Sequence, residues 1–373
     1  MAATGGTERM ITEKANYLSE RFGYDITIIS CFQSQNENNI FQLSNKVKQK
    51  NLGIPYFSQY KYKYPKRLWI KWKMNKLLKK SIIKAVETID PDILIGVSRF
   101  NANIISSIKC RAKKVIECHE ARYNTIYDIR EKPSFLERLF SKVYSYCYFH
   151  TIEQNANAVV VLTEKDKMMW GRAKCVEVIP NFSTMAVCHV SDCTTKRVIA
   201  VGRLTWEKGF DRLIEAWGMV SSKHPDWHLD IFGQGNMHDA LITLEKKYKA
   251  NNLTIHNTSS NISKEFTKSS ICAVTSYFEG FSLVILEAMK HGVPCVAFDC
   301  PFGPGSILDD SICGFLVENN DINLFAEKLC NLIEDEYLRK QFSKAAIEKA
   351  KSFDVDTIMS KLKLFYEQLV NEP

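Results

Sequence analysis

Short apolar runs alternate with amphipathic segments along almost the whole chain. The apolar runs are rich in Val and Ile and are bounded by turn residues, which is typical of strands buried on both faces. Between them, apolar residues recur at helical spacing, as in 210–223 and 324–334. The expected strands are 24–30, 93–97, 115–118, 158–162 and 176–179 in the first half, and 197–202, 228–232, 253–256, 271–274, 293–298 and 315–317 in the second. This alternation predicts an α/β protein with doubly wound parallel sheets.

The alternation is interrupted once, at residues 183–196, where Ser, Thr, His and Asp replace the periodic pattern. A chain of 373 residues is also long enough for two cores. The sequence therefore predicts two doubly wound domains, one from residue 1 to 185 and the other from 186 to 352.

The first domain begins unusually. Gly5 and Gly6 lead directly into an amphipathic helix, whereas such a turn normally follows a strand in a βαβ unit. The residues before Gly5 leave no room for that strand, so we expect it to be missing, either because the chain starts late or because the strand has been lost. Residues 32–58 are polar, rich in Asn and Gln, and predict a loop.

Composition restricts the class of protein. Hydrophobic residues make up 45% and charged residues 25% of the chain, as in soluble globular proteins. No apolar run has the length of a membrane span, and no secretory signal opens the chain. The 12 cysteines form no C-x-x-C pair, and several lie in apolar runs, so we expect buried thiols in a reducing cytoplasm rather than disulfides or zinc ligands.

Two acids, Glu279 and Glu287, flank the turn that follows the expected strand 271–274. Glu279 falls in the loop before a helix, and Glu287 falls about two turns further along. The intervening Gly280, Phe281 and Ser282 allow a ligand to approach the backbone at a helix N-terminus, which suits phosphate. The alternative is a surface helix with two scattered acids, and the Gly turn between strand and helix argues against it.

Two cations follow the first strand of the second domain, at the strand edge where open α/β sheets bind ligands. Gly202 permits close backbone approach, while Arg203 and Lys208 supply the charges that a diphosphate requires. Taken alone they would be an exposed basic loop. Two more Gly-bearing loops follow strands, at Gly233 and in 301–306, and each is weak evidence by itself.

His119 ends the strand 115–118, and its place at the carboxyl end of a strand favours a contact with ligand. No Ser/His/Asp arrangement supports a hydrolase. Asp354 and Asp356 resemble a metal-binding D-x-D, but they begin the last expected helix and are better interpreted as its acidic first turn. No metal site is expected.

Residues 60–84 are the most basic segment and contain no acid. Tyr62, Tyr64, Trp69 and Trp72 are interleaved with the Lys and Arg residues. A solvated basic face, a nucleic-acid site and an anionic membrane surface all remain open for it. We favour the membrane, and we expect no nucleic-acid partner because no recognised module accompanies the segment.

The combination of Glu279-x7-Glu287, Gly202-Arg203-x4-Lys208-Gly209 and the Pro-Phe-Gly-Pro loop resembles the family 4 (group 1) retaining glycosyltransferases of the GT-B fold. The resemblance extends over nearly the whole chain and is strongest between 176 and 317. It implies two Rossmann-like domains facing a cleft. It also implies that the helix in 353–373 packs back on the N-terminal domain.

The resemblance implies roles for individual residues. Arg203 and Lys208 would neutralise the donor diphosphate, Glu287 would bind the ribose, and Glu279 would contact the donor sugar. The remaining implied contacts to the sugar, the phosphates and the base of the cleft come from His119, Gly280, Phe281, Ser282, Leu283, Gly202, Gly233, Gly5 and Gly6. Transfer would be independent of metal and would retain the anomeric configuration. Ser306 departs from the family, since relatives often carry an acid there.

The expected function is therefore transfer of a sugar from a nucleotide-sugar to a glycan or lipid-linked acceptor, as in bacterial surface-polysaccharide synthesis. A UDP-sugar is the favoured donor, and no other cofactor is expected. The enzyme would work in the cytoplasm, peripherally at the inner face of the plasma membrane. The alternative is an inactive nucleotide-sugar-binding or scaffold protein that is truncated at its N-terminus.

Overall fold

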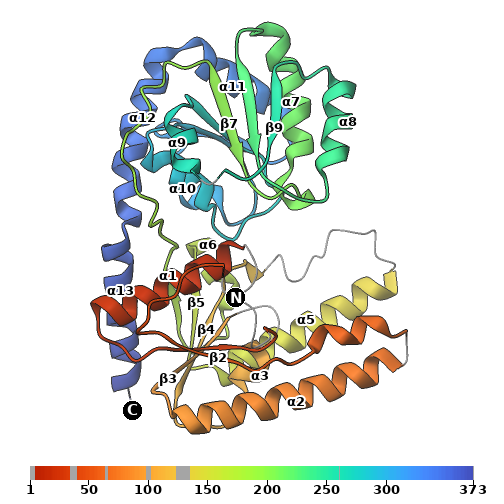
Figure 1. Ribbon diagram of the computed structural model, residues 1–373, viewed down its shortest axis with the longest axis vertical. Helices are drawn as coiled ribbons and strands as arrows, with labels where there is room; N and C mark the ends of the chain where they lie inside the picture. The colour runs from red at the N-terminus through yellow and green to blue at the C-terminus, as the bar shows by residue number, and fades with distance from the viewer. Residues whose placement is uncertain are drawn as a thin grey trace.

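The computed structural model describes residues 5–33, 40–63, 66–97, 102–122, 135–259 and 261–372. Its strands form three sheets, in which every pairing is parallel. Figure 1 shows the sheets in two bodies, which we call the N-terminal lobe and the C-terminal lobe. The predicted α/β architecture with parallel sheets is confirmed.

The C-terminal lobe is built on a six-stranded sheet in the order β12-β11-β10-β7-β8-β9. Its strands are β7 (Arg197–Val201), β8 (His228–Phe232), β9 (Leu253–His256), β10 (Ile271–Val274), β11 (Cys295–Asp299) and β12 (Gly314–Glu318). Its helices are α7 (Phe210–Lys223), α8 (His238–Tyr248), α9 (Ile262–Thr267), α10 (Leu283–Lys290), α11 (Ile322–Glu334) and α12 (Glu336–Ala350).

The side chains of each central strand alternate between two cores. In β7, Val198 and Ala200 pack with α7, α8 and α11, while Ile199 packs with α9, α10 and α12 on the other face. Helices thus cover both faces of the sheet, which is why its strands are continuous apolar runs.

The N-terminal lobe contains a four-stranded sheet, β3-β4-β5-β6, and a separate pair, β1-β2. Its strands are β1 (Thr27–Ser30), β2 (Lys48–Asn51), β3 (Ile93–Val97), β4 (Lys113–Glu117), β5 (Ala158–Val161) and β6 (Val176–Val178). Its helices are α1 (Gly6–Arg21), α2 (Lys66–Ile89), α3 (Ala102–Ser106), α5 (Phe135–Asn155) and α6 (Glu164–Lys167).

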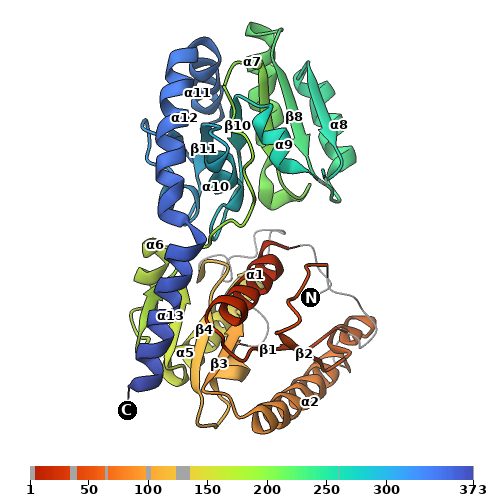
Figure 2. The ribbon, with the colours of Figure 1, turned by 60° about the vertical axis from the view of Figure 1, so that its left-hand side comes forward.

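The last helix, α13 (Val355–Asn371), leaves α12 and runs along the N-terminal lobe (Figure 2). Leu362 and Phe365 of α13 share a core with Met10 and Leu18 of α1 and with Val115 of β4. Helices α1 and α13 therefore cover the same face of the four-stranded sheet, while α3 and α5 cover the opposite face.

Within the described ranges, α1 is the first element, and β1 does not pair with β3. The two strands nevertheless share neighbours. Leu94 of β3 belongs to a core on which Cys31 and Phe32, next to β1, also pack. Side-chain packing, rather than backbone pairing, thus joins β1 to β3.

One strand was not predicted. Residues 32–58 were expected to be a loop, but Lys48–Asn51 forms β2. Three of its four residues are exposed, so it lies at a sheet edge and lacks the apolar pattern that identifies inner strands. Tyr64, an aromatic residue of the basic segment 60–84, lies outside the described residues.

The predicted acidic first turn of the last helix is confirmed. Asp354 caps α13 by accepting a hydrogen bond from the Asp356 N–H, as an acidic first turn should. All 12 cysteines are free, and Cys118, Cys272 and Cys295 are buried, whereas Cys31 is half-buried. None of the helices in the described ranges has the length and apolar composition needed to cross a bilayer.

Candidate functional site

Lys208 and Glu279 form an ion pair at the carboxyl edge of the C-terminal sheet. Lys208 Nζ lies 2.6 Å from Glu279 Oε1, and Ser276 Oγ donates a second hydrogen bond of 2.7 Å to the same oxygen. Both charged side chains are mostly buried. A desolvated ion pair is strong only when its geometry is good, and the Ser276 contact contributes to that geometry.

The two partners reach each other because their loops leave neighbouring strands, β7 and β10. Lys208 ends the short 3₁₀ helix Trp206–Lys208, and Gly209, with a φ of 63°, turns the chain into α7. Above the pair, the rings of Trp206 and Tyr277 are stacked with centroids 4.5 Å apart. The loop from strand to helix is thereby fixed on both sides.

Gly280 brings the two lobes into backbone contact. A Cβ at this position would lie 2.6 Å from the carbonyl oxygen of His119, which follows β4 in the N-terminal lobe. Only a glycine permits this approach. The structure therefore brings the predicted residues Glu279, Gly280 and His119 to one place between the lobes.

His119 is buried, and neither ring nitrogen has a partner at hydrogen-bond geometry among the described residues. Its Nε2 lies 3.3 Å from Glu117 Oε2, which is within ion-pair distance. Burial lowers the pKa of His119 more than Glu117 raises it, so the imidazole is neutral at pH 7. A neutral imidazole has one donor and one acceptor nitrogen, and the Nδ1 atom has no hydrogen-bond partner among the described residues.

Glu117 lies at the centre of a buried network. It accepts hydrogen bonds from Lys14 of α1, at 3.0 Å, and from Tyr366 of α13, at 2.7 Å. Burial alone would raise the pKa of Glu117, but the charge of Lys14, the nearby His119 imidazole and the hydrogen bond from Tyr366 bring it well below its usual range. Glu117 therefore stays ionised.

Glu287 lies apart from Glu279, on the buried side of α10. Its Oε1 accepts a hydrogen bond of 2.7 Å from Arg9 Nη1 of α1. Burial raises the pKa of Glu287, and Arg9 opposes that shift. The two acids predicted as one unit thus face different partners, one within the C-terminal lobe and the other across the lobes.

The N-termini of α1 and α10 lie close together. A Cβ on Gly6, the first residue of α1, would be 3.6 Å from Leu283 Cδ1, at the first position of α10. Gly5 precedes α1 as its N-cap, and Ser282 precedes α10. Both ends present N–H groups without an intrahelical partner and positive dipole ends, which attract anions.

Three other predicted site residues, Arg203, Phe281 and Ser282, have surroundings different from those of the Lys208–Glu279 pair. Arg203 is 60% exposed and pairs with Glu207 of its own loop, at 3.4 Å. Phe281 is buried against Phe353, with ring centroids 5.7 Å apart. The buried Ser282 Oγ has no hydrogen-bond partner in the described structure.

Gly202 and Gly233 lie behind the site, where their loops cross. Gly202 packs against the aliphatic part of Lys208, since a Cβ at this position would lie 3.4 Å from Lys208 Cδ. The Gly202 carbonyl oxygen in turn closely approaches Gly233. In the loop 301–306, Gly303 packs against Glu279, and Ser306 donates a hydrogen bond of 3.0 Å to the Phe302 carbonyl oxygen.

Sequence reasoning missed Arg212, which anchors this edge. It is buried and donates to Asn319 and Asn320, at 2.8 and 2.7 Å, and to the Thr275 carbonyl oxygen. Its guanidinium also lies 3.8 Å from the centroid of the Tyr277 ring. An arginine on the apolar side of the predicted helix 210–223 was the available signal, because a buried arginine requires several partners.

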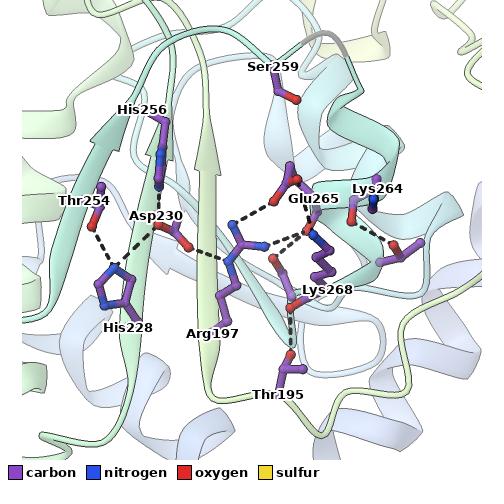
Figure 3. A network of polar contacts seen from close by, with 12 residues as sticks. Thr195, Arg197, His228, Asp230, Thr254, His256, Ser259, Lys264, Glu265 and Lys268 are labelled. Carbon is purple, nitrogen blue, oxygen red and sulfur yellow. Dashed lines mark hydrogen bonds and ion pairs between the residues drawn. The ribbon is translucent and has the colours of Figure 1, made fainter.

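A second polar cluster lies elsewhere on the C-terminal sheet (Figure 3). The buried Asp230 of β8 contacts Arg197 and His256 on the two neighbouring strands, and Arg197 also pairs with Glu265 of α9 at 2.9 Å. Its charges are paired within the cluster, which ties β7, β8, β9 and α9 together. In the part of the chain that the structure describes, no three His, Cys, Asp or Glu side chains are grouped so as to hold a metal ion.

Comparison with known proteins shows which family the chain resembles. Residues 189–349 match the family model of glycosyl transferases group 1. The chain is 28% identical to the amylovoran biosynthesis glycosyltransferase AmsD of Erwinia amylovora, over 96% of this chain and 95% of that protein. The chain is thus similar to the group 1 glycosyltransferases, with the family match in residues 189–349.

Solved structures agree with the GT-B fold of this family. The sucrose-phosphate synthase of Thermosynechococcus elongatus superposes with a TM-score of 0.80 at 16% identity, over 98% of this chain and 94% of that one. The Anabaena protein HepE, solved in complex with UDP, superposes with a TM-score of 0.72 at 17% identity, over 99% and 98% of the two chains. At these identities the likeness concerns the fold alone, and it confirms the predicted GT-B architecture.

Proposed function

We propose that this protein is a group 1 glycosyltransferase that moves a sugar from a UDP-sugar to a glycan or lipid-linked acceptor in surface-polysaccharide synthesis. The proposal includes retention at the anomeric carbon and independence from metal. The observation that carries it is the meeting of the Lys208–Glu279 pair, Gly280 and His119 between the two lobes.

Each group has a role in this proposal. Lys208 stabilises the charge that develops on the departing diphosphate, and the exposed Arg203 turns inward to join it. The N-termini of α1 and α10 receive the phosphates. Glu279 holds the donor sugar, and the neutral His119 offers it a hydrogen bond. Glu287 holds the ribose. The protein cations thus take the role that a divalent ion has in other transferases.

We further propose that the enzyme works at an anionic membrane surface. The surface concerned, which we call the α2–α5 surface, consists of Trp69, Trp72, Lys73 and Lys76 of α2 and Tyr144 of α5. Its three aromatic side chains are 59%, 60% and 61% exposed. Exposed Trp and Tyr among lysines suit the interface of a bilayer, which supports a lipid-linked acceptor and a site at the inner face of the plasma membrane.

The proposal is tested with purified protein and a panel of UDP-, GDP- and ADP-sugars. A donor at 100 times its dissociation constant should add about 2.7 kcal/mol to the free energy of unfolding. Slow hydrolysis of the bound donor, followed by NMR before mutarotation, shows which anomer is released first. Retention predicts the anomer of the donor, and an excess of EDTA should leave the rate unchanged.

An inactive nucleotide-sugar-binding protein is the alternative. It would show the stabilisation by donor without any turnover, either by hydrolysis or by transfer to membrane lipid extracts. If no nucleotide-sugar stabilises the protein at all, both assignments fail.

A further inference from the structure

Arg9 reaches from one lobe into the other. It lies near the start of α1 in the N-terminal lobe, and its Nη1 lies 2.7 Å from Glu287 Oε1 on α10 of the C-terminal lobe. The side chain of Glu287 is 7% exposed, so the arginine is a close partner of a largely desolvated carboxylate. A residue outside the predicted donor site thus contacts the acid that was predicted to bind ribose.

Further contacts fix Arg9 in this position. Its Nε donates to Glu13 Oε1 at 2.8 Å, one turn further along α1. The same oxygen accepts a hydrogen bond of 2.7 Å from Thr184, in the segment between the lobes. Lys290 of α10 donates to the carbonyl oxygen of Ser183 in that segment, at 2.7 Å. The guanidinium is therefore held at two nitrogens and has little freedom to leave Glu287.

This arrangement leaves Glu287 able to bind a ligand. An ionised carboxylate has about four lone-pair sites, and the described contact with Arg9 uses one oxygen. A protonated carboxyl group would instead present a donor, and its capacity to accept from hydroxyl groups would fall. Without a cation nearby, a carboxyl group as buried as Glu287 favours the protonated form.

We propose that Arg9 is a positioning residue for the donor: it keeps Glu287 ionised and oriented so that the carboxylate accepts hydrogen bonds from the ribose hydroxyls of a nucleoside diphosphate. The inference rests on the proposed function, in which Glu287 binds the ribose. It assigns part of the donor affinity to the N-terminal lobe, although Arg9 itself does not touch the nucleotide.

The charged groups that face Glu287 determine the pH at which its carboxylate takes up a proton once Arg9 is replaced. Glu13 of α1 raises the pKa of Glu287, whereas Arg9 and Lys290 lower it. Replacing Arg9 by Met leaves Lys290 as the nearby cation and Glu13 as a repulsive neighbour. In Arg9→Met, Glu287 should therefore take up a proton at a higher pH than in the wild type.

The experiment compares UDP with 2′-deoxy-UDP by calorimetric titration at pH 8 and pH 6. The proteins are the wild type, Arg9→Met, Arg9→Lys and the control Arg21→Met, which removes an exposed arginine from the same helix. We expect the wild type to prefer UDP by about tenfold at both pH values, because a hydrogen bond to a charged group is lost with the hydroxyl. Arg21→Met should behave like the wild type.

Arg9→Met should lose most of this preference, and more completely at pH 6 than at pH 8, while its affinity for 2′-deoxy-UDP changes little. If the role of Arg9 were purely structural, Arg9→Met would lower the affinities for UDP and 2′-deoxy-UDP by the same factor. An unchanged preference for UDP in Arg9→Met overturns the inference. If Arg9→Met does not fold, Arg9→Lys carries the test: one ammonium group cannot hold Glu13 and Glu287 as the guanidinium does, so the preference should fall at least threefold, and an unchanged ratio overturns the inference.

The wild type separates this inference from the proposed function. If it binds neither UDP nor any other nucleoside diphosphate, the proposed donor class is wrong. If it binds UDP and 2′-deoxy-UDP equally, Glu287 does not bind the 2′-hydroxyl and the inference fails, while the donor class stands.

Discussion

Lys208 and Glu279 lie on the loops of two neighbouring strands, and their charged atoms are 2.6 Å apart. The pair joins the 3₁₀ helix after β7 to the loop after β10. Glu279 is thus oriented by a cation on the neighbouring loop. Two positions 71 residues apart in the sequence form one polar centre.

Replacing Lys208 by Met should lower transfer by about 10²–10³-fold, because one preorganised charge at the leaving group is lost. The fold should persist, since Ser276 still donates to Glu279. The measurement is the rate of UDP release at saturating donor. Lys196→Met is the matched control, because Lys196 is exposed and pairs with the surface residue Asp226. Equal rates for the two variants would contradict the role of Lys208.

Replacing Gly280 by Ala should separate the lobes at the site. The new Cβ would meet the His119 carbonyl oxygen at 2.6 Å, and backbone on both sides cannot yield cheaply. We expect transfer to fall by at least tenfold, while the melting temperature changes by only a few degrees, because the contact lies outside the cores. Gly171→Ala is the control, since a Cβ there meets nothing within 4 Å. Full activity of Gly280→Ala would show that the lobes adjust freely.

Much of the fold could be predicted because inner parallel strands are continuous apolar runs. The predicted strands 228–232 and 271–274 agree with β8 and β10 to the residue. β2 could not be predicted, because an exposed edge strand such as Lys48–Asn51 has no apolar pattern. The candidate site likewise has residues that a local pattern could predict and contacts that it could not. Lys208, Glu279 and the glycines Gly202 and Gly233 follow strand ends, which a local pattern identifies.

Their partners could not be predicted. The pairing of Arg9 with Glu287 spans 278 positions, and that of Tyr366 with Glu117 spans 249. Both depend on how α1 and α13 pack, which no local pattern encodes. The sequence could indicate only that a polar residue lies on the apolar side of a helix, as Lys14 does.

The Lys14–Glu117 pair should contribute strongly to stability. Both side chains are 6% exposed, so removing one partner leaves a buried charge unpaired. We expect Lys14→Met to lower the free energy of unfolding by about 3–5 kcal/mol, measured by urea denaturation. The double variant Lys14→Met/Glu117→Leu should recover part of the loss, because no charge then remains buried. A double variant as unstable as the sum of the two single variants would show that the pair is not coupled.

The α2–α5 surface should bind anionic vesicles. Wild-type protein is expected to sediment with vesicles containing anionic lipid, less so at high salt, and not with neutral vesicles. Trp69→Ala/Trp72→Ala should lower the partition at least tenfold, because two interfacial anchors are lost while the charge is kept. The control is Tyr337→Ala, an aromatic residue of α12 that is 71% exposed. Retention of RNA in place of vesicles would favour a nucleic-acid site instead.

His291 should make stability depend on pH. It is fully buried; its Nδ1 donates to the Glu287 carbonyl oxygen at 2.7 Å, and its Nε2 lies 2.7 Å from Ser263 Oγ. Burial lowers the pKa of His291 in the folded state. Below the unfolded pKa of about 6.5, the unfolded chain therefore binds a proton that the folded chain does not, and stability falls as the pH falls.

For one such histidine the slope is at most about 1.4 kcal/mol per pH unit. His119 contributes in the same direction, because burial lowers its pKa too. Urea denaturation at intervals between pH 7.5 and 5.5 measures the slope. His291→Gln should reduce it by the share of one histidine, whereas His238→Gln, at a half-exposed position, should leave it unchanged. If the slopes of His291→Gln and the wild type coincide, His291 is protonated in the folded state as readily as in the unfolded chain, and its burial does not carry this pH dependence.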